Sequence, residues 1–142
     1  SGKIKDWGAL KTALSEFRKK YNLHAAHVAI PDEESYVFHT KIKGIPRREI
    51  RARLLEEIEQ NVPLSLNEIL FDYQLARDES GEVSVTVLPE KTIEEYFSLF
   101  HERGFSPLSF ELVAHALARS LCRDCFVFRE ELVRERHRLR AV

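Results

Sequence analysis

The stretch HVAIPDEESYVFHTKIKGIPRREIRARLLEEIEQNVP, residues 27–63, decides the fold class, because two kinds of apolar periodicity follow each other within it. Apolar and polar residues alternate in residues 24–30 and again in residues 35–43, as they do in half-buried strands. The turn PDEE at residues 31–34 fits a hairpin between these strands. After Pro46, apolar residues return at the spacing of one helix face: Ile50, Leu54, Leu55 and Ile58. The stretch therefore predicts a strand hairpin followed by an amphipathic helix.

The rest of the chain extends this pattern in both directions. Asp6 can cap a helix over residues 7–21, whose apolar residues are spaced 3, 4, 3 and 4. Thr92 and Glu95 form a capping box, which predicts a helix that ends at Gly104. The remaining expected elements are strands at residues 67–78 and 83–87 joined by the turn ESGE, a short strand at residues 106–112, and a helix at residues 112–121.

This order of elements predicts an α+β fold. We expect two layers, a mostly antiparallel sheet of about five strands with helices packed on one face. The chain opens with SGK and contains no methionine, so we expect residues 1–5 to be a cloning remnant and leader, and the chain to be an excised piece of a longer protein. Residues 6–121 should form a single α+β domain, and residues 122–142 a charged C-terminal helix or tail.

Composition narrows the function classes only moderately. The 142 residues are 44% apolar and 32% charged, which is ordinary for a soluble globular domain. The formal net charge of -1 gives no overall positive field for nucleic acid, and no apolar run is long enough to span a membrane. Two cysteines are too few for a disulfide framework, so we expect a cytoplasmic protein.

Common catalytic motifs are missing from the sequence. The five glycines form neither a dinucleotide-binding nor a phosphate-binding loop, and neither a GxSxG nor an HExxH pattern occurs. We therefore expect no enzyme activity and no cofactor. The basic segment RREIRAR at residues 47–53 could contact RNA, but few aromatic residues accompany it, and pairs such as Arg53 with Glu57 explain it as a soluble helix face.

Cys122 and Cys125 form the sharpest candidate for chemistry. With His115 and His137 they give a Cys2His2 set in the order H-x6-C-x2-C-x11-H, which matches no common zinc template. A redox pair would need the start of a helix, whereas these thiols follow the end of one. A small zinc-dependent or thiol-dependent module remains the alternative function. His27 and His39 could lie near each other in the first hairpin as a cross-strand metal pair, but half-exposed polar strand residues are the better interpretation.

Several short motifs, taken in order over residues 24–121, resemble the inserted subdomain of PilM-type actin-like proteins of type IV pilus assembly. The division protein FtsA and the cytoplasmic domain of the type II secretion L protein carry related subdomains. The matching motifs are Ala29-Ile30-Pro31, Ile45-Pro46, Glu59, Val62-Pro63, Asp72-Tyr73, Val87 to Pro89, Tyr96, Gly104, Pro107 and Ala116 to Arg119.

The resemblance implies a protein-interaction module. In that family the tail of the membrane protein PilN lies between the actin-like body and this subdomain. The resemblance therefore implies a PilN-like tail or a sister subunit as the partner, and it leaves the oligomeric state of the chain open. The expected location is the inner face of the cytoplasmic membrane, reached through partners, without direct insertion and without nucleic acid. The two Asp-x-Gly phosphate loops of the family are missing here. The candidate partner-binding residues are Tyr36, Phe38, Ile45, Arg48, Arg51, Asp72 and Tyr73.

Overall fold

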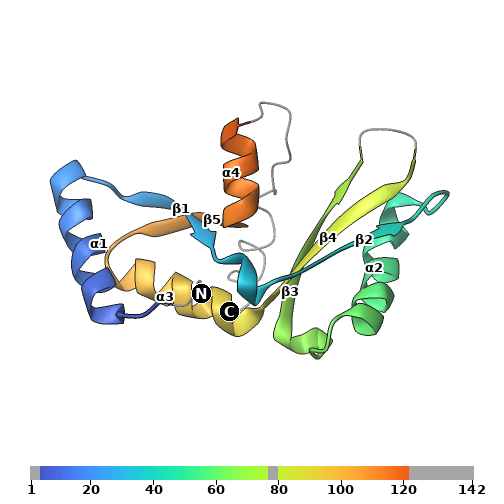
Figure 1. Ribbon diagram of the computed structural model, residues 1–142, viewed down its shortest axis with the longest axis horizontal. Coiled ribbons are helices and arrows are strands. Elements are labelled where there is room, and N and C mark those ends of the chain that lie inside the picture. The colour runs from blue at the N-terminus through green and yellow to red at the C-terminus, as the bar shows by residue number, and fades with distance from the viewer. Residues whose placement is uncertain (1–3, 77–79, 122–142) are drawn as a thin grey trace. The chain divides into compact units, whose positions relative to one another are not determined.

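A computed structural model describes residues 4–76 and 80–121, and in it the chain divides into two compact units (Figure 1). Unit 2 is Glu34–Lys91, and unit 1 combines Ser1–Glu33 with Thr92–Val142. Residues 6–121 are divided between these two units, and the single domain expected over them stays a prediction. Most of the expected leader at residues 1–5 lies outside the described residues. The expected tail at residues 122–142 lies entirely outside them. The elements are α1 (Trp7–Tyr21), β1 (Ala25–Ile30), η1 (Asp32–Glu34), β2 (Tyr36–Lys41), α2 (Arg47–Asn61), η2 (Leu66–Glu68), β3 (Ile69–Leu75), β4 (Glu82–Pro89), α3 (Glu90–Glu102), β5 (Ser106–Leu112) and α4 (Val113–Leu121).

Unit 2 is a three-stranded antiparallel sheet in the order β2-β4-β3, with α2 packed on one face. The valines of the central strand, Val83, Val85 and Val87, are completely buried under this helix. Leu54 and Ile58 of α2 are equally buried, as the helical spacing of the sequence predicts. Each such side chain contributes about 1.5–3 kcal/mol relative to an exposed position, so this core holds the helix on the sheet.

Unit 1 contains a two-stranded parallel sheet of β1 and β5. The predicted hairpin between residues 24–30 and 35–43 is therefore wrong. The first strand pairs with β5, bringing Val28 opposite Phe110 and Ile30 opposite Leu112, all four buried. Alternation predicts a strand but does not identify its partner, and the PDEE turn leads from one unit to the other.

The α+β class and the five strands are confirmed, and the strands lie in two sheets instead of one. Both strand pairs of unit 2 are antiparallel, so the sheets are mostly antiparallel as expected. One helix boundary differs: α3 begins at Glu90, directly after β4, so Thr92 is a buried residue of the first turn instead of its cap. The helix thus begins two residues before Thr92, a difference that is common at helix ends.

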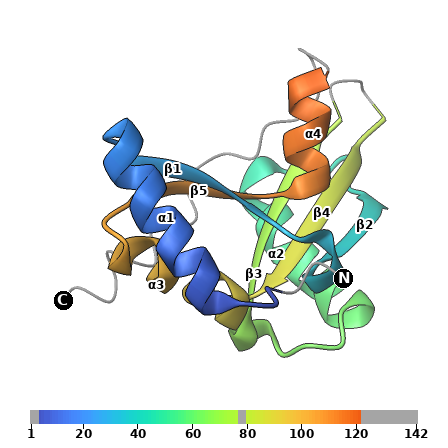
Figure 2. The same cartoon turned by 60° about the vertical axis from the view of Figure 1, so that its left-hand side comes forward.

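Three contacts attach α1 to α3 and to the chain that follows it. The ring of Trp7 lies 6.4 Å from that of Tyr96, and Lys11 Nζ lies 3.3 Å from a carboxylate oxygen of Glu102. Arg18 Nε donates to the backbone oxygen of Gly104 at 2.9 Å. Figure 2 shows α1 in front of α3 on this side of unit 1. Because α1 has no fully buried residue, these contacts matter for its position.

The start of α4 is capped from the end of β1. Both carboxylate oxygens of Asp32 accept from the backbone N–H of Ala114, at 3.2 and 3.3 Å. Because β1 and β5 run parallel, the residues that follow the two strands lie close together at the same end of the sheet. A carboxylate at a helix N-terminus also interacts favourably with the helix dipole, so Asp32 stabilises this junction.

Candidate interaction surface

The predicted partner-binding residues all belong to unit 2, but they do not form one surface. Tyr36, Phe38, Ile45 and Tyr73 are partly buried against the hydrophobic core. The register explains this placement for Tyr36 and Phe38, which lie opposite Val87 and Val85 on the face that α2 covers. These residues thus contribute to packing at the margin of the core.

Asp72 lies on the other face of the sheet. Asp72 pairs with Thr86 of β4, and Thr86 pairs on its other side with Val37 of β2. Oδ1 of Asp72 accepts from the backbone N–H of Tyr73 at 2.8 Å. Successive strand residues point to opposite faces, so Asp72 and Tyr73 cannot contact one partner group from the same side.

The outer face and the two edges of this sheet offer contacts to a partner. Val37 is 46% exposed, and His39 beside it on the same face is exposed as well. Within the described residues, β2 and β3 each pair with β4 alone, so each has one free edge. Free edges present backbone donors and acceptors to which an extended peptide can add as a strand.

The first half of α2 carries four exposed arginines, and three of them are Arg47, Arg48 and Arg51. The guanidinium of Arg51 lies 4.5 Å from the ring centroid of Phe71 on β3. A cation over an aromatic ring at an exposed site contributes about 0.5–1 kcal/mol, so this contact fixes Arg51 at the β3 side of the helix. The sequence gives no local signal for it, because the two residues lie on different elements.

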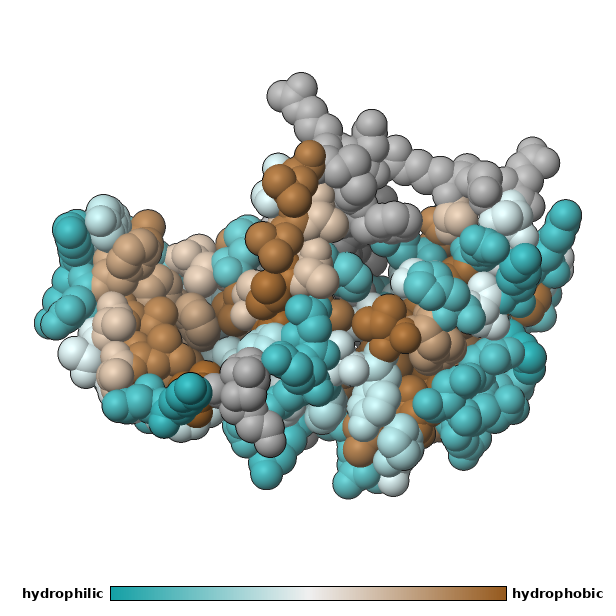
Figure 3. All heavy atoms as spheres, viewed as in Figure 1, coloured by the Kyte–Doolittle hydropathy of each residue, from teal (hydrophilic) through white to brown (hydrophobic). Residues whose placement is uncertain are grey.

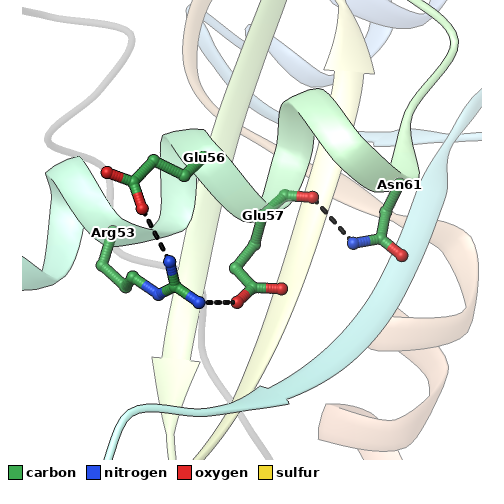
Figure 4. Close-up of polar contacts among 4 residues, drawn as sticks. All are labelled: Arg53, Glu56, Glu57 and Asn61. Atoms are coloured by element: carbon green, nitrogen blue, oxygen red, sulfur yellow. Dashed lines mark hydrogen bonds and ion pairs between the residues drawn. The ribbon is translucent and has the colours of Figure 1, made fainter.

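Arg53 belongs to a different group of charges, shown in Figure 4. Its Nη1 lies 2.6 Å from Glu56 and its Nη2 lies 2.7 Å from Glu57, which confirms the predicted pair of Arg53 with Glu57. The hydrogen bond to Glu56 and the charge of Glu57 raise the pKa of Arg53 above its ordinary value. Asn61 Nδ2 donates to the backbone oxygen of Glu57 at 2.7 Å, closing the last turn.

The other charges of α2 are paired much less completely. In the described part of the chain, no carboxylate lies within ion-pair distance of Arg47 or Arg51, and no cation within that distance of Glu59. Arg48 contacts its neighbour Glu49 at 3.2 Å, with both side chains exposed. Arginines at the N-terminus and glutamates at the C-terminus oppose the helix dipole, so this distribution does not stabilise the helix.

The zinc and thiol hypothesis stays untested. His115 lies on α4, while Cys122, Cys125 and His137 fall outside the described residues. Residues 4–76 and 80–121 contain no group of three His, Cys, Asp or Glu side chains that could hold a metal. The pair of His27 and His39 loses its basis, because the hairpin that would bring them together does not form and His27 Nδ1 contacts Ser109 Oγ at 2.6 Å.

Unit 1 exposes an apolar stripe along α4. Val113, Leu117 and Leu121 recur every four residues, and Figure 3 shows hydrophobic surface along this helix. Large exposed apolar groups of this kind are typical of contact surfaces. No helix among the described residues is both long enough and apolar enough to cross a bilayer.

Comparisons with known proteins bear on the fold. No protein-family model matches the sequence, and no curated protein matches it significantly. Among solved structures, a chain of a PilM–PilN type IV pilus biogenesis complex is similar with a TM-score of 0.67 and 16% identity, covering 84% of this chain and 38% of that chain. The cytoplasmic domain of EpsL, an inner membrane component of the type II secretion system of Vibrio cholerae, is similar with a TM-score of 0.59 and 12% identity, covering 71% of this chain and 42% of that chain.

The fold of this chain is therefore similar to part of PilM-type and EpsL-type structures, in agreement with the resemblance seen in the sequence. Its correspondence to the inserted subdomain stays a prediction. The chain spans about two fifths of the length of each of these two structures.

Proposed function

We propose that this chain is a non-catalytic protein-interaction module of a type IV pilus or type II secretion assembly platform, and part of a longer actin-like protein. The observation that carries the proposal is its likeness in fold to a chain of the PilM–PilN complex. The partner would be a PilN-like membrane protein, which would hold the module at the cytoplasmic face of the membrane.

Unit 2 supplies the contacts that such a partner would use. The free edges of β2 and β3 could pair with an extended segment, and the outer face of the sheet exposes Val37 beside the β2 edge. Backbone pairing would give affinity, while alternate side chains of the added strand would give selectivity. Of the two edges, we propose that the partner segment pairs with the edge of β2, because Val37 on this strand is the most exposed large apolar side chain of unit 2.

Calorimetric titration with a synthetic PilN-type cytoplasmic tail tests the proposal. We expect saturable binding that weakens by about tenfold in Val37→Asp, because a charge would then be buried at the contact. Lys19→Glu on α1 serves as the control and should bind as the original chain does. A folded chain that fails to bind the tail, while a full-length PilM-type protein binds it, contradicts the proposal for this segment.

A further inference from the structure

Positive charge gathers at the end of unit 2 where β2 leads into α2. Residues 41–51 contain five cationic side chains and one anionic side chain, in a protein whose formal net charge is -1. A tight turn keeps the start of the helix close to the end of the strand, because the backbone N–H of Ile45 donates to the oxygen of Ile42 at 3.2 Å (Figure 1). We call this surface the basic end, and its residues are Lys41, Lys43, Arg47, Arg48 and Arg51.

The cations of the basic end are all exposed, and they are poorly neutralised within the chain. Lys41 Nζ lies 3.5 Å from a carboxylate oxygen of Glu82, and Arg48 Nε lies 3.2 Å from one of Glu49. Exposed ion pairs of this kind contribute little, so they hold the two cations only weakly. The cations with no carboxylate within ion-pair distance, among the residues that the structure describes, are Lys43, Arg47 and Arg51.

The position of these arginines on α2 adds to the positive potential instead of offsetting it. The N-terminus of a helix carries a partial positive charge, so cations there oppose the helix dipole. Pro46 at the N-cap makes no side-chain hydrogen bond to the first turn, in which Glu49 is the single acid. Further along the same helix, Arg53 is held by both Glu56 and Glu57. The arginines of the basic end thus gain nothing from the helix itself, and their charge is available to an external anion.

We propose that the basic end binds the anionic headgroups of a lipid bilayer surface. Guanidinium groups form paired hydrogen bonds with phosphate oxygens, and ammonium groups add an attraction that needs no fixed geometry. Cations on long, flexible stems can reach one plane from different elements, and here they come from a strand, a turn and a helix. Attraction to a charged membrane depends mainly on how many cations lie near it, as in polybasic segments beside membrane spans.

Two other kinds of anionic partner fit the basic end less well. Single-stranded nucleic acid is bound by aromatic side chains that stack on the bases, but Arg51 already lies over the ring of Phe71, at 4.5 Å from its centroid. An acidic peptide needs cations along one line, whereas Lys41 lies on the outer face of the sheet and the arginines lie on the helix that covers the inner face. The choice of a membrane rests in part on the proposed function, which places the chain beside one.

Binding through the basic end should be reversible and sensitive to salt. Each Lys or Arg near an anionic leaflet strengthens binding by about fivefold, and salt screens this attraction beyond about 10 Å at about 0.1 M. One such patch is a weak anchor, so stable attachment to the membrane needs a second contact. A partner protein in the same membrane would supply that contact, because it raises the local concentration of the chain. The basic end would then orient unit 2 toward the lipid.

Co-sedimentation of the 142-residue chain with lipid vesicles tests the proposal, with no partner protein present. We expect the chain to bind phosphatidylcholine vesicles that contain about one third phosphatidylserine, and not to bind vesicles of phosphatidylcholine alone. Binding should fall by about tenfold or more at about 0.5 M salt. Arg47→Gln with Arg48→Gln should weaken it by about 25-fold, because two cations are removed and each contributes about fivefold.

Lys19→Gln with Lys20→Gln on α1 is the matched control, because it removes the same charge from two exposed positions. This control variant should bind the anionic vesicles as the original chain does. Urea unfolding checks the fold of each variant, and the arginine variant should be at least as stable as the original chain, because its cations oppose the helix dipole.

Three results would overturn the proposal. The first is a folded chain that binds neither kind of vesicle at low salt, or binds both equally. The second is an arginine variant that binds the anionic vesicles as tightly as the control variant does. The third is a chain that fails to bind these vesicles but binds polyglutamate or single-stranded RNA, which assigns the basic end to that partner instead. A chain that binds the PilN-type tail but no vesicles contradicts this inference alone, whereas one that binds anionic vesicles but not the tail contradicts only the proposed function.

Discussion

Replacing Gly104 by alanine should destabilise the chain more than the same replacement at Gly44. Both glycines have left-handed backbones, with φ of 81° and 82°. A Cβ on Gly104 would lie 2.8 Å from Nε of Arg18 and 3.0 Å from its Cζ, whereas a Cβ on Gly44 would meet nothing within 4 Å. The two substitutions therefore share the backbone strain and differ in the collision with Arg18.

The magnitudes follow from these two terms. Alanine in the left-handed conformation costs about 1–2 kcal/mol, which is the whole expected effect at Gly44. At Gly104 the side chain of Arg18 must also move and lose its 2.9 Å hydrogen bond to the backbone oxygen of Gly104, which adds about 1 kcal/mol for an exposed group. We expect Gly104→Ala to lower the free energy of unfolding by about 2–3 kcal/mol.

Urea unfolding followed by circular dichroism measures both variants, and fluorescence of Trp7, the single tryptophan, reports on unit 1. The second arm of the experiment uses the background Arg18→Ala, in which Gly104→Ala should cost only the backbone strain. Equal costs at Gly104 and Gly44, or a cost at Gly104 that does not fall when Arg18 is removed, would refute this reasoning.

Three further outcomes are expected. Leu54→Ala should lower the free energy of unfolding of unit 2 by about 2–5 kcal/mol in urea, because the side chain is completely buried, and a cost below 1 kcal/mol would contradict its place in the core. The hydrogen bond and charge of Lys11 lower the pKa of Glu102, so this stabilisation is complete above the unfolded pKa of about 4.3 and is lost as pH falls through the folded pKa. Thermal melts between about pH 6 and pH 3 should show a smaller loss for Lys11→Ala than for the original chain, and parallel curves would exclude the effect. Asp32→Ala should cost about 0.5–2 kcal/mol by removing the cap of α4, while Asp32→Asn keeps an acceptor and should cost less; equal unfolding curves for the two would argue against the cap.

Local patterns predicted the β3–β4 hairpin and the buried face of α2, because both signals are local in sequence, but they did not predict that β2 pairs with β4. The alternation around Val85 and the helical spacing of Leu54 both report on burial within one element, and β3 pairs with the strand that follows it. The partner of β1 could not be predicted in this way, because Val28 pairs with Phe110 after a long intervening segment. Nothing in either strand distinguishes that partner from the nearer β2.

The sequence predicted which charged residues of the candidate surface are exposed, but not which face of the sheet its strand residues occupy. The sequence indicates that Arg48 and Arg51 are exposed and that Arg53 pairs with Glu57, as the structure has them. It does not say that Phe38 faces the helix, because the covered face of a strand depends on the register with its neighbour. The contact of Arg51 with Phe71 likewise requires the packing of α2 on the sheet.

The parallel pairing of β1 with β5 has a consequence for how the chain folds during synthesis. Unit 2 is continuous in sequence, and its first and last strands are brought together where Tyr36 lies opposite Val87. We therefore expect unit 2 to fold during synthesis before β5 is made, since the strand that pairs with β1 lies about 80 residues further along the chain. Once unit 2 is folded, the long loop between β1 and β5 is already closed by structure, and the entropy cost of joining them falls. We expect unit 1 to be the slow step of folding, and its rate to depend on the prior stability of unit 2.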